Sequence, residues 1–417
     1  MSLLKDFSVS TITAGFVASL VGLTSGIALM FEAAQALGAD DAQIASWVWA
    51  LCVGMAVLTV VPSLLLRVPT MVAFSAPGAV IIATLEPGEF TVAHGVGAFI
   101  LNGIAITIVG YFGLFERFMD RIPTPLVSAL LGGVIARFII SGFADAATAP
   151  WLIVITTLTY VVIRQLAPRY AVVGVLVAGV TTAVISNSMR TEELTLSLAK
   201  PIGVAPSFTL SAVVSIAIPL FIVTMAGQNL PGVAALRATN YEVPISKIVG
   251  STGVGTVLLA PFGGFTFNLS AVSAAICMES SAHEDPARRY TAAIANGGFY
   301  LLAGLFGTSI TAALRAFPIE LVHIVAALAL LPTIGNSLVA AARDESHRDA
   351  AMLTFLVTLS GVTVAKIGSP FWGAVAGVLA MMISSAAVRR RLRRWKPATD
   401  PGADDSQPAA SSPAPKR

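Results

Sequence analysis

The sequence predicts an all-α polytopic membrane protein with about 14 transmembrane segments, arranged as a 7+7 inverted repeat in which segments 3 and 10 are short and broken. Three observations support this prediction. Of the 417 residues, 56% are hydrophobic and only 11% are charged, against roughly 25% charged in a soluble domain. The apolar residues form runs of about 20, the length of a spanning helix. Two shorter apolar segments occupy corresponding places in the two halves.

The long apolar runs have helical lengths, and only helices or closed barrels satisfy their backbone groups in lipid. In the first half we expect spans at residues 11–37, 43–66, 94–115, 124–143, 150–165 and 171–188. In the second half we expect spans at residues 208–230, 244–260, 289–310, 319–340, 350–367 and 370–388. The first run lacks a small-residue cleavage site, so we interpret it as a retained span rather than a signal peptide.

The two broken segments are residues 69–85 (PTMVAFSAPGAVIIATL) and 261–278 (PFGGFTFNLSAVSAAICM). An odd number of crossings per half inverts the second half, so these segments should lie antiparallel and meet near the bilayer midplane. If each is an extended stretch followed by a half-helix, two helix N-termini point at one place with unpaired N–H groups and partial positive charge. Such a place would bind an anion without a buried arginine or lysine.

The alignment of the broken segments puts Phe74 on Phe267 and Ser75 on Asn268, and the helices that open each half align Gly26 with Gly227. A third element, GQNLPG at 227–232, carries two amides and a proline, which should break a helix inside the membrane where it lines a cavity. The alternative is helix packing through small residues. The candidate substrate-binding residues are Ser25, Gly26, Phe74, Ser75, Ala76, Pro77, Gly78, Gln228, Asn229, Phe267, Asn268, Leu269 and Ser270.

Lysine and arginine fall in alternate loops, which predicts that both termini are cytoplasmic in a bacterial-type inner membrane. Residues 395–417 are rich in Pro, Ala, Ser and Asp, so we expect a disordered cytoplasmic tail. The formal net charge is only +3, and no basic groove with interleaved aromatics indicates a nucleic-acid partner. Cys52 and Cys277 lack metal-ligand spacing and are interpreted as packing residues, so no cofactor or metal is expected.

Four segments of the chain resemble the benzoate:proton symporter family (BenE type), which shares a fold with uracil and xanthine permeases. They are ALGADDAQIASWVWAL at 36–51, FSAPGA at 74–79, GQNLPG at 227–232 and FNLSAVSAAI at 267–276. The resemblance implies an elevator-like movement of a core domain against a gate domain, and a homodimer through the gate. The implied division is core helices 1–4 at 1–122, gate helices 5–7 at 123–206, core helices 8–11 at 207–311 and gate helices 12–14 at 312–394.

In the nucleobase permeases the eighth helix supplies an acidic residue where this chain has Gln228. A second acidic residue, on the tenth segment, is replaced by Phe267 or its neighbour. The loss of both carboxylates suits an anionic substrate, which a fixed negative charge would repel. Phe74 and Phe267 are placed to flank an aromatic ring.

A benzoate-like acid is ionised at neutral pH, so its uptake against the membrane potential needs a coupled cation. Ionisable residues inside spans are the candidates for carrying the proton: Glu32, Glu320 and His323. Glu32 has the alternative of a structural carboxylate near the outer helix end. Glu320 and His323 are three residues apart and could share a proton, or Glu320 could only cap its helix. Arg137 could reach the outer surface or pair with Asp145.

The sequence therefore predicts a secondary active transporter that takes up benzoate or a related aromatic carboxylate with protons. The alternatives are a nucleobase or a small inorganic anion on the same fold, or an anion channel. A channel would need a continuous pore, and charge rings or carbonyl-rich filter repeats are missing from the sequence. An enzyme is not expected, because four scattered histidines and two lone cysteines give neither a metal cluster nor a nucleophile with its base.

Overall fold

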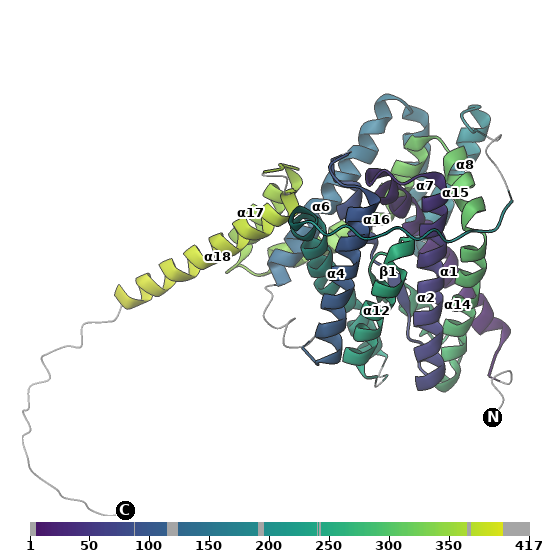
Figure 1. The fold of residues 1–417 in the computed structure, drawn as a ribbon, viewed down its shortest axis with the longest axis horizontal. Helices are drawn as coiled ribbons and strands as arrows, with labels where there is room; N and C mark the ends of the chain where they lie inside the picture. Colours follow the sequence, from purple (N-terminus) through teal and green to yellow (C-terminus); the bar gives the residue numbers. More distant parts are fainter. Residues whose placement is uncertain are drawn as a thin grey trace, which may run out of the picture.

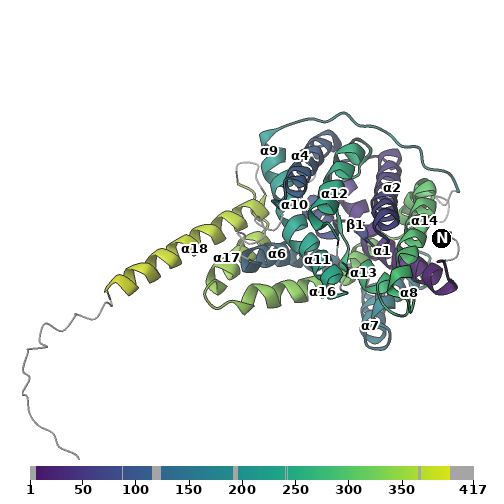
Figure 2. The same ribbon diagram turned by 90° about the horizontal axis from the view of Figure 1, so that it is seen from below.

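The computed structural model of the protein describes residues 6–86, 88–114, 124–190, 196–239, 241, 243–364 and 368–394. The chain forms a body of helices around one short pair of strands, and α18 projects away from that body (Figures 1 and 2). The tail expected at 395–417 lies outside the described residues.

The first half of the chain contains eight α-helical or strand elements and two short 3-10 turns in the described residues. They are α1 (Val9–Ala36), α2 (Asp41–Leu66), β1 (Val72–Phe74), α3 (Ala76–Ala83), α4 (Val92–Tyr111), α6 (Thr124–Ala144), η2 (Asp145–Ala147), α7 (Pro150–Leu166), η3 (Pro168–Tyr170) and α8 (Ala171–Ile185). Side-chain caps fix two of the helix starts, because Ser8 and Asp40 each accept a hydrogen bond from the third backbone N–H that follows.

The second half begins with one long helix whose turns alternate between α and π geometry. Its parts are α9 (Leu210–Ala212), η5 (Val213–Ala217), α10 (Ile218–Ile222), η6 (Val223–Asn229) and α11 (Leu230–Ala238). The remaining elements are α12 (Ile245–Leu259), η7 (Ala260–Phe262), β2 (Phe267–Leu269), α13 (Ala271–Cys277), η8 (Pro286–Arg288), α14 (Tyr290–Leu305), α15 (Gly307–Ala316), α16 (Ile319–Arg343), α17 (Arg348–Leu359) and α18 (Ser369–Arg394).

The expected helix break at GQNLPG is wrong, because the segment stays helical as the end of η6 and the start of α11. Each of the two π-helical stretches lies just before a proline, Pro219 after η5 and Pro231 after η6. A proline lacks the N–H for an α-helical bond and its ring clashes with the carbonyl four residues earlier. The wider π turns accommodate both prolines without unwinding the chain.

Seven helices of the described chain are long and apolar enough to cross a membrane, or eight if the pair formed by residues 286–305 and α15, bent by 69°, is one span. The helices α7 and α8 and the first part of α18 are apolar but shorter. Mean hydropathy over the whole chain is +0.84. The coarse prediction of a helical, multi-pass membrane protein is therefore confirmed, and its finer count of about 14 segments is not decided by helix length.

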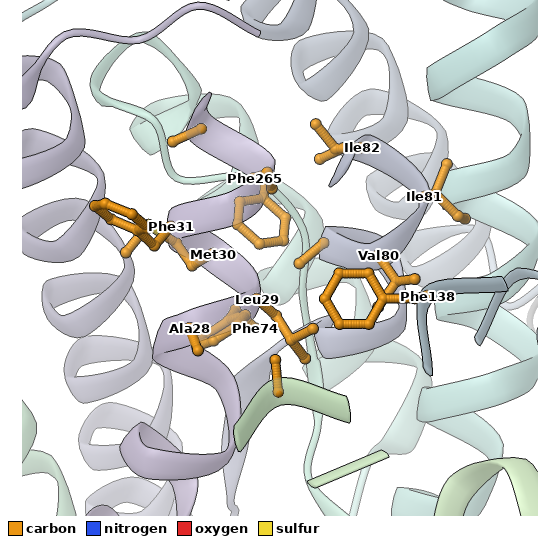
Figure 3. Packing of buried hydrophobic residues seen from close by; sticks show 14 of the residues in the cluster. Ala28, Leu29, Met30, Phe31, Phe74, Val80, Ile81, Ile82, Phe138 and Phe265 are labelled. Carbon is orange, nitrogen blue, oxygen red and sulfur yellow. The ribbon is translucent and has the colours of Figure 1, made fainter. Parts of the chain in front are cut away.

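The helices pack in two groups. In one group α4 packs on α12 and α2 on α14, while α1 packs on α3, α13 and α14. In the other group α6 packs on α16 and α17, α7 on α8, and α17 on α18. The strands lie inside the body among α1, α2 and α12 (Figures 1 and 2). Around them the rings of Phe74 and Phe265 pack with aliphatic side chains of α1 and α3 in one buried cluster (Figure 3).

Candidate functional site

The two broken segments meet as an antiparallel strand pair, as the sequence predicted. Ala73 faces Asn268 at the centre of the register, with Phe74 opposite Phe267. The pairing extends by one bond on each side: Ser75 N–H donates to Thr266 O at 3.0 Å, and Ser270 N–H donates to Met71 O at 2.9 Å. Each strand then runs directly into a short helix, α3 or α13. The expected order of extended stretch followed by half-helix is thus confirmed in both halves.

The detailed alignment of the two segments is wrong by two residues. Ser75 is the N-cap of α3 and accepts from Gly78 N–H at 3.1 Å, whereas the N-cap of α13 is Ser270, which accepts from Ser273 N–H at 3.2 Å. Ser75 therefore corresponds to Ser270 rather than to Asn268. Phe74 and Phe267 lie opposite each other, but Phe74 is the last residue of β1 and Phe267 is the first residue of β2, so their positions in the two segments are not equivalent.

The first N–H of each strand is satisfied by a threonine from the preceding long helix. Thr59 of α2 accepts from Val72 N–H, and Thr256 of α12 accepts from Phe267 N–H, each at 3.1 Å. Both threonines are fully buried. Such matched contacts hold the ends of the strands inside apolar surroundings, where an unpaired backbone N–H is costly.

The π-helical segment η6 is tied to both broken segments. Thr224 Oγ1 lies 3.3 Å from Ser75 Oγ as a donor, and Asn229 Oδ1 accepts from Leu269 N–H at 2.9 Å. Thr224 and Asn229 are fully buried. Asn268 donates from Nδ2 to Leu269 O at 2.8 Å, while its buried Oδ1 lacks a hydrogen-bond partner in the described part of the chain. Asn229 and Asn268, predicted from sequence, are thus brought to one place, and Thr224 joins them.

Gln228 is half-buried, and its neighbour along the chain, Gly227, lines a small cavity between η6 and the start of α6. This cavity holds about 30 Å³, room for a water molecule or two. Its lining consists of Thr124, Val127, Ser128, Leu131, Ala226, Gly227 and Leu230. An aromatic acid does not fit this volume, so α6 and η6 must separate to admit one. Two larger cavities, of about 630 and 650 Å³, lie at other helix ends.

The two phenylalanines predicted to flank a substrate have different environments. The Phe74 ring lies over Gly26 of α1 and meets Phe265 edge-on, with ring centroids 5.6 Å apart. Phe267 is fully buried, with its ring against Gly54 of α2. Both rings are therefore packed in this conformation, and Phe74 directly precedes the first turn of α3, which contains Ala76, Pro77 and Gly78. Ser25 lies in α1, but its side chain is outside the description.

The ionisable candidates form a contact that the sequence did not predict. His323 of α16 lies between two carboxylates, with Nε2 at 3.3 Å from Glu32 Oε1 and Nδ1 at 2.6 Å from Asp145 Oδ2. Glu320 instead accepts from Thr148 Oγ1 at 3.3 Å, so the expected partner of His323 was wrong. Arg137 likewise pairs with Glu86 at 3.6 Å rather than with Asp145.

Two residues of these sites were missed by sequence reasoning. Thr224 lies four residues before Gln228. If that segment is helical, both side chains lie near one face, and this spacing could have identified Thr224. Asp145 lies in η2, and nothing in its local sequence links it to His323, 178 residues away. Among the described residues, no group of three or more His, Cys, Asp or Glu side chains is arranged to hold a metal ion.

The sequence profile of BenE, described as benzoate membrane transport protein, matches residues 5–383. Two curated relatives match along almost their whole length. The inner membrane protein YdcO of Escherichia coli K12 is 40% identical over 382 residues, covering 91% of this chain and 97% of the relative. The benzoate membrane transport protein of Acinetobacter baylyi ADP1 is 34% identical, covering 92% of this chain and 97% of the relative.

Solved structures share the fold at low sequence identity. The transmembrane domain of the cyanobacterial bicarbonate transporter BicA superposes with a TM-score of 0.56 at 14% identity, covering 89% of this chain and 97% of that domain. SLC26A9 superposes with a TM-score of 0.62 at 11% identity, covering 93% of this chain and 67% of that protein. Murine Slc26a9, described as an anion transporter in the inward-facing state, gives 0.58 at 11% identity, covering 92% of this chain and 69% of that one.

Proposed function

The chain belongs to the BenE family of benzoate membrane transport proteins, and from that premise we propose that it takes up benzoate or a related aromatic carboxylate together with protons. The observation that carries the proposal is the strand pair, from which two half-helices begin beside the amide-bearing segment η6. In the proposed site the substrate carboxylate lies at the N-terminus of α3, and the aromatic ring lies near Phe74. Gln228 and Asn229 add polar contacts without a repelling charge.

We propose fourteen crossings in a 7+7 inverted repeat. In the described chain, the seven long helices, the bent pair, the three shorter apolar helices, α17 and the half-helices α3 and α13 together number fourteen. The matched strand contacts of Thr59 and Thr256, and of Ser75 and Ser270, support the repeat. Both termini would then be cytoplasmic in an inner membrane.

The two packing groups correspond to the proposed core and gate domains. The group around α1, α2, α4, α12 and α14 carries the strand pair, and the group around α6 and α16 faces it. An elevator-like displacement of the first group against the second would open the narrow space beside Gly227. A homodimer through the gate helices is part of the same proposal.

The test is uptake of radiolabelled benzoate into proteoliposomes with an imposed inward proton gradient. Protein-free vesicles correct for passive entry of the neutral acid. We expect uptake above that background, collapse of accumulation with a protonophore, and at least tenfold loss in Gln228→Ala. Excess unlabelled uracil, sulfate and bicarbonate are the competitors for the rival substrates. Displacement of benzoate by one of them at lower concentration than by benzoate itself would assign the site to that substrate. Benzoate-independent ion currents would instead indicate a channel.

A further inference from the structure

We propose that Glu32, His323 and Asp145 form one proton-binding site that latches the core to the gate, and that protonation of Glu32 releases α1 from α16. The inference rests on the proposed function, since it assigns the coupled proton to a place distant in sequence from the substrate segments. The three residues come from three elements, α1, η2 and α16. Only Glu32 belongs to the core group; the other two belong to the gate group.

The geometry of the cluster is that of a bridge. The imidazole of His323 presents one ring nitrogen to each carboxylate, at 3.3 Å to Glu32 and 2.6 Å to Asp145. The side chains of all three are largely buried, with 15%, 29% and 25% of Glu32, His323 and Asp145 exposed. The buried Oε1 of Glu32 has no well-aligned hydrogen bond within the described residues, so its contact with His323 is electrostatic. Protonation of Glu32 would weaken this contact.

Other charged groups around α16 are engaged elsewhere or lie far away. On α16 itself Glu320 binds Thr148. On α6, Arg137, which is eight residues before Asp145, pairs with Glu86. On α7, Tyr160 and Arg164 lie toward the end of the helix that is far from Asp145. At 1.5 Å per residue, Arg164 is about 21 Å along the helix from Pro150.

Among the described residues, a further charged neighbour at this end is Arg190, an exposed residue whose backbone N–H donates to Ala316 O just before α16. Arg348 and Asp349 of α17 lie beside the far end of α16. The sequence of α8 contains no ionisable residue, and its Gly179 lies against Leu321 of α16. Among the described residues, Glu32 and Asp145 are thus the carboxylates in contact with His323.

An apolar cavity lies immediately beyond the cluster, so the charge of Glu32 decides whether α1 can move in that direction. It holds about 200 Å³ between α1, α8, α15 and α16, and Thr24 is the one polar residue in its lining among the side chains that the structure describes. Ala28, one turn before Glu32, and Val322, next to His323, both line it. Sliding α1 by one turn, about 5.4 Å, would bring Glu32 to the level that Ala28 now occupies. A carboxylate would lose its partner there, whereas the neutral acid carries no charge to desolvate.

The proton can reach Glu32 through the ring of His323. A proton taken up on Asp145 Oδ2 passes to Nδ1 while Nε2 gives its proton to Glu32 Oε1. Asp145 returns to the carboxylate, His323 remains neutral in the opposite tautomer, and Glu32 becomes the neutral acid. Glu32 then carries no negative charge to hold against the N–H of His323, and α1 is free to move with the substrate site.

The first experiment separates coupling from movement in proteoliposomes. Glu32→Gln and His323→Gln are compared with Glu86→Gln, a matched exposed glutamate outside the cluster. For the two cluster variants we expect proton-driven accumulation of benzoate to fall at least tenfold while exchange of labelled for unlabelled benzoate falls less than threefold. Glu86→Gln should accumulate benzoate within twofold of the wild type. Full accumulation by Glu32→Gln would overturn the inference and leave the proposed function intact.

The second experiment needs no substrate and therefore decides the latch even if benzoate is not transported. Spin labels at Gln35→Cys on α1 and Ser141→Cys on α6, both exposed, report the distance between the two groups by electron–electron resonance, with the two buried native cysteines replaced by alanine. We expect a second distance population to rise as pH falls from 7.5 to 5, and to be present at both pH values in Glu32→Gln. Identical wild-type distributions at the two pH values would refute the latch.

Discussion

Asn229 offers the sharpest test of the strand-pair site, because it both binds the backbone of β2 and adds a polar contact to the proposed substrate site. Its Oδ1 accepts from Leu269 N–H at 2.9 Å, and both residues are buried. Asn229→Ala removes the acceptor and leaves a buried backbone N–H unpaired, which costs about 1–3 kcal/mol, and the lost volume adds to this. Asn229→Asp retains an acceptor oxygen and adds a negative charge. At about 6 Å from a substrate carboxylate and an effective dielectric of ~20, repulsion is about 3 kcal/mol, or ~100-fold in affinity.

The two variants should therefore differ in the affinity assay. Asn229→Ala should lower the thermal unfolding midpoint of the detergent-purified protein. Asn229→Asp should also lower it, because it buries a carboxylate, and should in addition need about a hundredfold more benzoate for half-maximal counterflow. Asn336→Ala, an exposed asparagine on α16, is the control for both measurements. If the alanine variant kept wild-type stability, the tie to β2 would be unimportant. An unchanged benzoate affinity in the aspartate variant would remove the substrate from this site.

Gly26→Ala should reduce benzoate uptake at least tenfold because the added methyl overlaps the ring of Phe74, and adding Phe74→Leu should restore part of that uptake. Thr59→Val and Thr256→Val should each lower stability by about 1–3 kcal/mol in denaturant titrations, since each leaves the first N–H of a strand unpaired; a loss in only one of them would contradict the matched roles. Arg137→Gln should change stability by no more than about 1 kcal/mol, because its ion pair is partly exposed, and a larger loss at high salt would show that another contact matters.

The main elements of the fold follow from composition and periodicity. The long apolar runs predicted helices close to those observed, as for residues 43–66 and α2, because a spanning helix must be apolar over a fixed length. The broken segments were also identifiable, since proline, glycine and polar residues interrupt both at corresponding places. Their exact correspondence was not, because Ser75 and Ser270 are matched by capping geometry and not by sequence identity.

The polar connections were the least predictable part of the candidate site. Thr224 and Asn229 reach different broken segments from one π-helical stretch, and its widened turns set the directions of the two side chains. Local sequence propensity does not indicate a π-helix here. The same holds for His323, whose nearest ionisable residue along the helix, Glu320, binds Thr148 instead. Contacts between residues far apart in sequence depend on how helices pack.

By itself, then, the sequence determined that this is a multi-pass helical membrane protein, that it resembles benzoate carriers, and that two interrupted segments lie antiparallel at its centre. These follow from local composition, since lipid admits only helices or closed barrels, the long apolar runs here have helical lengths, and interruptions are tolerated only where protein covers them. The tertiary structure alone decided which polar groups meet. It brought Glu32, His323 and Asp145 together and packed the ring of Phe267 against α2. The reason is that close-packed helices fix side-chain neighbours that no local pattern encodes.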